Sequence, residues 1–196
     1  LKKYSILFYM IKEYIEEGIA LKNAILKDGA LLSAVEKSID LLHTCLTSGN
    51  KVLIAGNGGS AADSQHFAAE IMGKFKKERK SYPALALTTD TSFLTAWSND
   101  TSFESIFSRQ IEGLGKPGDV FFSISTSGNS KNIIEGILAA RKIGMKTICL
   151  SGRDGGRTKG LADIELIVPS NNTPRIQEIH IMLIHTICEE LENRLV

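Results

Sequence analysis

The sequence predicts an α/β fold, a three-layer, doubly wound parallel sheet with an N-terminal helical arm. Short apolar segments of strand type alternate with segments whose apolar residues recur at helical spacing. The strand-type segments are apolar at nearly every position, which is typical of parallel strands covered by helices on both faces. Residues 1–48 show helical patterns alone, so we expect an arm at 1–48 and one α/β domain at 49–196.

These two hydrophobic patterns, strand-type segments and helical spacing, predict the following elements in chain order. The arm should hold two helices, the first from about Met10 to Leu26 and the second from about Gly29 to Thr47. Strand-type segments follow at Lys51–Ala55, Pro83–Leu87, Val120–Ile124, Thr147–Leu150 and Ile164–Val168. Helical segments separate or follow them at Ala61–Met72, Thr91–Ser98, Ser102–Ile111, Asn132–Ile143 and Arg175–Leu195. The apolar runs are far too short to span a bilayer, so we expect no membrane partner.

Composition and charge describe an ordinary globular chain. Of 196 residues, 43% are hydrophobic and 23% charged, which is enough apolar side chain to bury a core. The formal net charge of +1 provides no overall attraction to nucleic acid, so an anionic ligand must be held by a local device. The cysteines, Cys45, Cys149 and Cys188, are three in number and widely spaced, as expected of buried thiols in a reducing compartment. We therefore expect a cytoplasmic protein.

A glycine-rich loop follows the first predicted strand. Gly56-Asn57-Gly58-Gly59-Ser60 comes directly after Lys51–Ala55, and a helix begins behind it. Ligands of parallel α/β sheets bind beyond the carboxyl ends of strands, where glycines let a ligand approach the backbone and a helix N-terminus attracts anions. Ser60 stands where an N-cap is expected. The alternative is a tight strand-to-helix turn with no ligand.

A hydroxyl-rich loop follows the strand at Val120–Ile124. Its residues Ser125-Thr126-Ser127-Gly128-Asn129-Ser130 carry four hydroxyls in six positions at the head of a helix. Hydroxyls, backbone amides and the helix dipole together can bind a phosphate without a cationic side chain. A loop that only caps its helix needs one hydroxyl, so the pattern favours phosphate binding over capping.

Two segments concentrate groups that can act in catalysis or bind a metal. His66 and Glu70 stand four residues apart on one predicted helix and therefore share a face. His185 and Gln177 lie on the last helix, and His180 lies between them. Imidazole nitrogen and carboxylate oxygen both suit zinc, although a pair at this spacing is more often a helix-surface contact.

At these residues the chain resembles a known family. GNGGS at 56–60 and ISTSGNS at 124–130 are similar to the sugar isomerase (SIS) domain, a flavodoxin-like sheet that binds sugar phosphates. HFAAE at 66–70, ALTTDTSFLTAWSND at 86–100 and RIQEIHIMLIH at 175–185 narrow the resemblance to the phosphoheptose isomerases. The resemblance covers nearly the whole chain from about residue 15.

The resemblance implies an activity and an assembly. Members of the family interconvert sedoheptulose 7-phosphate and D-glycero-D-manno-heptose 7-phosphate through an ene-diol, for the heptose of cell-envelope lipopolysaccharide or capsule. They are cytoplasmic homotetramers that assemble through the helical N-terminal region, and the same is expected here. The partner is then a phosphorylated seven-carbon sugar.

The resemblance also implies roles for residues. Glu70 is the expected base and His185 its acid partner. A zinc ion is expected on His66, Glu70, Gln177 and His185. Substrate contacts are expected from Asn57, Gly58, Gly59, Ser60, Glu70, Asn99, Asp100, Ser125, Thr126, Ser127, Ser130 and Gln177. For the pair Asn99 and Asp100, a simple turn is the alternative.

Helix geometry and two departures bear on these expectations. Gln177 and His185 stand eight residues apart, about 12 Å along a helix. They could meet one ion only if both side chains converge or if a neighbouring subunit supplies one of them, so we expect the site at or near a subunit interface. Lys74 stands where many relatives carry Arg, and Pro174 where many carry an acidic residue; Pro174 suits the first turn of the last helix.

Two other functions stay open. One is an isomerase of a different sugar phosphate. The other is a non-catalytic SIS adaptor that binds a replication-initiator protein; it needs none of His66, Glu70, Gln177 and His185, and their presence disfavours it.

Overall fold

The computed structural model describes residues 2–196, with side chains from residue 6 onward. Leu1, the first residue of the predicted arm, lies outside the described residues. The helices are α1 (Lys2–Ile25), α2 (Gly29–Thr47), α3 (Gly59–Met72), α4 (Thr91–Asp100), α5 (Ile106–Leu114), α6 (Lys131–Ile143) and α7 (Thr173–Leu195). The strands are β1 (Val52–Gly56), β2 (Ala84–Ala86), β3 (Val120–Ser125), β4 (Lys146–Gly152) and β5 (Ile164–Val168). Short 3-10 turns, η1 (Phe103–Ser105) and η2 (Gly156–Thr158), complete the elements.

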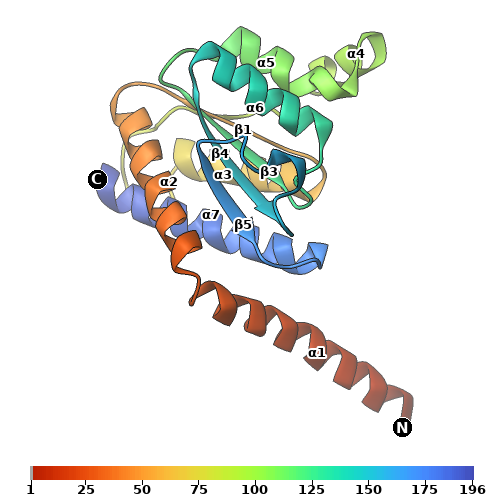
Figure 1. The fold of residues 1–196 in the computed structure, drawn as a ribbon. Coiled ribbons are helices and arrows are strands. Elements are labelled where there is room, and N and C mark those ends of the chain that lie inside the picture. Colours follow the sequence, from red (N-terminus) through yellow and green to blue (C-terminus); the bar gives the residue numbers. More distant parts are fainter. Residues whose placement is uncertain (1) are drawn as a thin grey trace.

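The strands form one parallel sheet with the order β2-β1-β3-β4-β5. This is the flavodoxin-like order, in which the chain first moves to one side of β1 and then to the other. Helices cover both faces, so the predicted three-layer α/β fold is confirmed (Figure 1).

Alternate residues of the strands point into two cores. On one face, Ile54 and Phe122 pack with residues of α2, α3 and α7. On the other face, Leu53 and Phe121 pack with residues of α5 and α6. Burial on both faces explains why the strand segments are apolar throughout.

Local capping explains several helix boundaries. Asp28 begins α2 by accepting a hydrogen bond from the Leu31 backbone at 3.0 Å, and Asp90 does the same for α4 through Phe93. Gly144 ends α6 in the left-handed conformation that favours glycine. Pro174 lies in the first turn of α7, as predicted.

The two predicted arm helices have different surroundings. Helix α2 contributes Leu31, Val35 and Leu42 to the core beside α7, so it forms part of a helical layer. Helix α1 alone projects from the body of the molecule (Figure 1). Its attachment includes Asn172 Nδ2, which donates to Glu17 at 2.9 Å. No helix within residues 2–196 is long and apolar enough to cross a membrane.

Candidate active site

The glycine loop and the hydroxyl loop lie side by side at the carboxyl edge of the sheet. Strands β1 and β3 are neighbours, and Gly56 is in register with Ile124. The side-chain amides of Asn57 and Asn132 exchange two hydrogen bonds of 2.9 Å, which joins the first loop to the start of α6. Strand order reverses between these two strands, and crevices at such switch points are where doubly wound sheets bind ligands.

The hydroxyls of the second loop converge rather than cap the helix. Ser125 Oγ and Ser130 Oγ lie 3.3 Å apart. Ser130 occupies the N-cap position of α6, yet its side chain accepts no hydrogen bond from the first turn. Ser127 Oγ accepts from the Asn129 backbone at 3.1 Å. The hydroxyls of Ser125 and Ser130 therefore meet at the start of α6, where free backbone N–H groups favour an anion.

A strap from the end of β4 fixes the hydroxyl loop. Gly128 has φ +62°, and a Cβ there would lie 1.9 Å from the Gly155 carbonyl oxygen. The Thr158 backbone N–H donates to the Gly128 carbonyl at 2.9 Å. Only glycine fits this close backbone approach.

The start of α3 differs from the prediction. Gly58, with φ 57° and ψ −120°, is the N-cap, and Ser60 lies buried within the first turn, so the prediction of Ser60 as cap was wrong. The reason is that glycine alone adopts this backbone conformation and so moves the helix start forward. A Cβ on Gly59 would lie 2.2 Å from Gln177 Nε2, so the Gln177 amide packs against the glycine loop.

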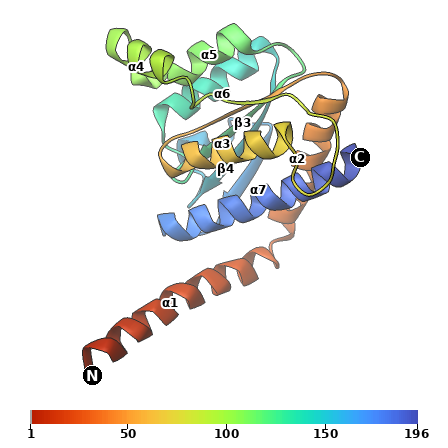
Figure 2. The same ribbon diagram turned by 180° about the vertical axis from the view of Figure 1, so that it is seen from behind.

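His66, Glu70 and His185 come together between α3 and α7. His66 Nε2 lies 3.1 Å from Glu70 Oε1 and 3.4 Å from His185 Nε2. The two helices lie side by side (Figure 2) and run parallel, with Gly59 beside Gln177 and His66 beside His185. Three residues chosen from sequence on two distant helices are therefore neighbours in space.

A cavity of about 470 Å³ runs along the same pair of helices. Its lining joins Gln177 to His66 and includes Gly59, Ala62, Asp63, Pro174, Glu178 and Ile181. Sequence reasoning missed Asp63, whose Oδ2 is buried with no hydrogen-bond partner among residues 6–196. Burial raises the pKa of Asp63, and the nearby charges of His66 and His185 act against that rise. Asp63 stands three residues before His66 and so shares its helix face, and this spacing could have identified Asp63 from the sequence.

Other predicted residues lie apart from this cluster. Asn99 Nδ2 donates to Asp100 Oδ1 at 2.8 Å at the end of α4, and within residues 6–196 neither hydrogen-bonds to another predicted site residue. Three helical turns separate Gly59 from Glu70, about 16 Å along α3. Within one chain, the glycine loop lies at the start of α3 and the His66–Glu70–His185 cluster lies near its end.

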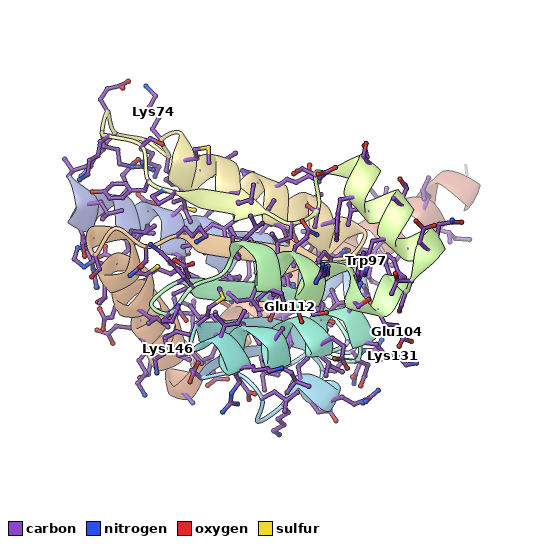
Figure 3. All side chains as sticks on the ribbon, turned by 90° about the horizontal axis from the view of Figure 1, so that it is seen from above. Lys74, Trp97, Glu104, Glu112, Lys131 and Lys146 are labelled. Carbon is purple, nitrogen blue, oxygen red and sulfur yellow. The ribbon has the colours of Figure 1, made fainter. Side chains whose placement is uncertain are left out.

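The basic residues near these motifs are engaged at the surface. Lys74 pairs with Glu78 beyond the end of α3, and Lys131 Nζ lies 2.6 Å from Glu104 (Figure 3). Neither forms a hydrogen bond with the hydroxyl loop among the described side chains. A phosphate at this loop would therefore be bound by hydroxyls and backbone amides.

The donor set fits a zinc ion chemically. Two imidazole nitrogens and a carboxylate oxygen are zinc ligands, and ligand atoms around tetrahedral zinc lie about 3.3 Å apart, close to the two distances from His66. Within residues 6–196, however, no three His, Cys, Asp or Glu side chains already surround one point. His66 contacts both Glu70 and His185, whereas no hydrogen bond joins Glu70 to His185 among the described side chains.

Comparisons with known proteins identify the family of this chain. A family model described as SIS domain matches residues 13–152. A protein of Sulfurimonas denitrificans named phosphoheptose isomerase is 48% identical over 195 residues, covering 100% of this chain and 97% of that protein. One of Helicobacter pylori (strain P12) with the same name is 50% identical over 181 residues, covering 92% and 93%.

Solved structures are similar over the same length. The phosphoheptose isomerase GmhA from Neisseria gonorrhoeae superposes with a TM-score of 0.88 at 43% identity, covering 95% of this chain and 99% of that one. A phosphoheptose isomerase from Francisella tularensis gives 0.90 at 37% identity, covering 95% and 98%.

Proposed function

The chain belongs to the SIS domain family and, within it, to the phosphoheptose isomerases, and on this premise we propose how its residues act. The reaction is the aldose–ketose interconversion of sedoheptulose 7-phosphate and D-glycero-D-manno-heptose 7-phosphate. The observation that supports it best is the contact of His66 with both Glu70 and His185, beside a cavity that leads to the glycine loop.

The phosphate binds at the hydroxyl loop. Ser125, Thr126, Ser127 and Ser130 supply hydroxyls, and the N-terminus of α6 supplies backbone N–H groups and a positive dipole end. This contact is remote from the reacting carbons, so its binding energy can hold the carbonyl end in place. Asn57, Gly58, Gly59, Ser60, Asn99, Asp100 and Gln177 are proposed to contact the sugar.

Glu70 and His185 move the protons. Glu70 removes a proton from C1 of the ketose, and His185 donates a proton to the carbonyl oxygen on C2, giving the ene-diol. Glu70 then returns its proton to C2, while His185 takes the proton from the oxygen on C1, giving the aldose. Each group ends in its starting protonation state, as catalysis requires.

We propose that His66, Glu70, Gln177 and His185 are the ligand set for a zinc ion. When bound, it would polarise the carbonyl and stabilise the oxyanion of the ene-diolate. A carboxylate on zinc is a weaker base and an imidazole nitrogen on zinc has no proton to donate, so metal binding by Glu70 and His185 competes with their roles in proton transfer. Elemental analysis tests this ligand set without any assay of turnover: about one zinc per chain is expected in the parent protein and a large loss in His66→Ala. Equal metal content in the two proteins would exclude His66 as a ligand.

We propose that the chain works as a homotetramer in which neighbouring copies complete each site. The apolar residues Ile11, Ile15 and Ile19 of α1 are about half exposed in one chain, within a surface hollow that also contains Phe8. The separation of Glu70 from the loops along α3 supports a site assembled from more than one copy. Cys45, Cys149 and Cys188 are free and buried, which supports a cytoplasmic location.

Glu70→Gln is the direct test of the function. It should fold normally and lose at least about a hundredfold in kcat on sedoheptulose 7-phosphate, because the amide cannot accept the proton. Glu112→Gln is the matched control, since Glu112 is an exposed helical carboxylate paired with Arg109 on α5. Full activity of Glu70→Gln would remove Glu70 as the base.

A substrate panel separates the remaining alternatives. Turnover of a different ketose phosphate with no turnover of the heptose phosphate would reassign the substrate. An inactive parent protein that holds a replication initiator would favour the adaptor.

A further inference from the structure

The segment between α3 and β2 wraps around the end of α3 and reaches α7. It begins at Gly73 and ends at Pro83, and it carries Arg79, whose guanidinium lies 3.1 Å from Glu192 on α7. Both side chains are almost fully buried, with 4% and 2% exposed. A buried ion pair between a connecting segment and the last helix needs an explanation, because burial of charge is costly unless every polar atom is satisfied.

The carboxylate of Glu192 is fully satisfied by the connecting segment. The backbone N–H groups of Phe75, Lys76 and Lys77 donate to it at 2.8, 2.6 and 2.8 Å. With Arg79, four donors converge on two oxygens. The carboxylate therefore fixes the backbone of residues 75–77 against α7.

Arg79 makes a second contact that ends at the proposed base. Its Nη2 donates to the Glu70 backbone carbonyl at 2.7 Å. This carbonyl lies in the last turn of α3, where carbonyl groups have no partner within the helix and where a cation is favoured. Arg79 thus ties the helical turn that carries Glu70 to α7.

The fixed backbone also places a side chain against the proposed acid. The Phe75 ring lies 5.6 Å from the His185 ring, centre to centre. The Phe75 backbone is held by Glu192, two helical turns after His185 on α7. The ion pair is therefore connected to both proposed catalytic residues: Arg79 binds the Glu70 carbonyl, and Glu192 holds Phe75 against His185.

We propose that Arg79 and Glu192 are positioning residues that hold Glu70 and His185 at their working separation. Neither touches substrate, and the inference rests on the proposed function of Glu70 and His185. The planar guanidinium is essential because one group must bind Glu192 and the Glu70 carbonyl together, which a lysine ammonium cannot do with the same geometry.

Arg79→Lys tests the proposal, with Asp119→Asn as the structural control. Asp119 is also fully buried and accepts from Lys51 Nζ and from two backbone N–H groups, but its partners, Lys51 and Lys116, precede β1 and β3 and belong to neither α3 nor α7. Arg79→Lys should lower kcat about tenfold or more and leave KM within about twofold, since small misplacements of catalytic groups are costly while the phosphate loop is untouched. Asp119→Asn should lower thermal stability without this loss of kcat. Equal kcat in the two folded variants would overturn the proposal.

Histidine NMR provides a readout independent of turnover. Arg79→Lys should move the imidazole resonances of His66 and His185 and leave those of His43 and His180 in place. Asp119→Asn should move none of the four. Unmoved His66 and His185 signals in Arg79→Lys would refute the positioning role even if activity fell, and moved signals would support it even if the parent proved to act on another substrate.

Phe75→Leu serves if Arg79→Lys does not fold. It leaves the ion pair intact and removes the aromatic contact, so His185 should shift while His66 shifts less, and kcat should fall about threefold to tenfold. An unchanged His185 resonance and unchanged kcat would overturn the proposal.

Discussion

Gly128 shows how one residue can shape a binding loop. Its backbone lies in the left-handed region, and the strap at Gly155 leaves no room for a Cβ. We predict that Gly128→Ala displaces the hydroxyl loop, raises the KM for the sugar phosphate about tenfold or more, and costs about 1–3 kcal/mol in the free energy of unfolding. Steady-state kinetics and urea unfolding measure both effects.

A second glycine controls for the change of residue type. Gly113 lies in α5, and nothing is within 4 Å of a Cβ placed there. Gly113→Ala should leave KM unchanged and stabilise the chain by about 0.5–1 kcal/mol. A KM for Gly128→Ala equal to that of the control would show that the loop tolerates the side chain.

His180 is a buried histidine that the mechanism does not use. Its Nε2 donates to the Ser151 carbonyl at 3.0 Å, and burial lowers its pKa from 6.5 to about 4. Between these two pH values the unfolded chain binds more protons at this residue than the folded chain, so stability falls as pH falls from 6.5 to 4. The full loss due to this residue is about 3 kcal/mol.

His180→Gln should remove this share of the pH dependence. The amide of the variant can still donate to Ser151 but does not titrate. Urea unfolding at pH 7, 6, 5 and 4.5 should give a shallower decline for His180→Gln than for the parent, and His43→Gln on α2 should decline like the parent. Parallel curves for His180→Gln and the parent would mean that burial does not change the pKa of His180.

At the scale of elements, the junction between the β1 and β3 loops depends on a pair of amides. Asn57 and Asn132 each donate to and accept from the other. We predict that Asn132→Ala frees the glycine loop and raises KM about fivefold to twentyfold with little change in kcat, because uniform binding is lost.

The control for this pair is an asparagine at the other end of the same strand. Asn50 precedes β1 at the opposite edge of the sheet and packs near Gly118. Asn50→Ala should leave KM unchanged. If Asn132→Ala also left KM unchanged, the two loops would not depend on each other for binding.

Elements whose signal is local could be predicted from sequence. Strand Ile164–Val168 and helix Gly29–Thr47 have the predicted bounds. Helix α1 begins at Lys2, eight residues before the predicted start at Met10, and the remaining elements differ by a few residues at their ends. The segment Ser102–Ile111 was predicted as one helix but divides into η1 and α5, because Ser102 caps the short turn through Glu104. Such boundaries depend on side-chain to backbone bonds that periodicity does not report.

The parts of the site that could not be predicted depend on contacts between distant segments. The pattern of α3 and α7 identifies His66 and His185, but only the fold shows that the helices run parallel with these residues adjacent. The roles of Arg79 and Glu192 required knowing that residues 75–77 meet α7. From sequence alone, the basic residues of 74–80 and the acidic residues at the end of α7 would both be predicted to lie on the exposed surface.

At the scale of the whole molecule, α1 is a helix whose apolar side chains remain exposed in a single chain. It projects from the body, and Phe8, Ile11, Ile15 and Ile19 remain 66%, 48%, 58% and 53% exposed. Contiguous apolar surface of this kind marks an interaction site. In contrast, α2 buries its apolar face within its own chain. An assembly through α1 therefore changes nothing in the core of a single copy.

This separation makes the assembly testable without unfolding the chain. We predict that the double variant Ile11→Glu with Ile15→Glu keeps the thermal stability of the α/β body but has a smaller mass in solution than the parent by light scattering. Isomerase activity should fall with the mass, since neighbouring copies are proposed to complete each site. Lys22→Glu, an exposed change on the same helix, should alter neither. If the double variant kept the parent's mass, α1 would not be the assembly surface; if it became a fully active monomer, each chain would hold a complete site and Glu70 would reach the sugar from within its own copy.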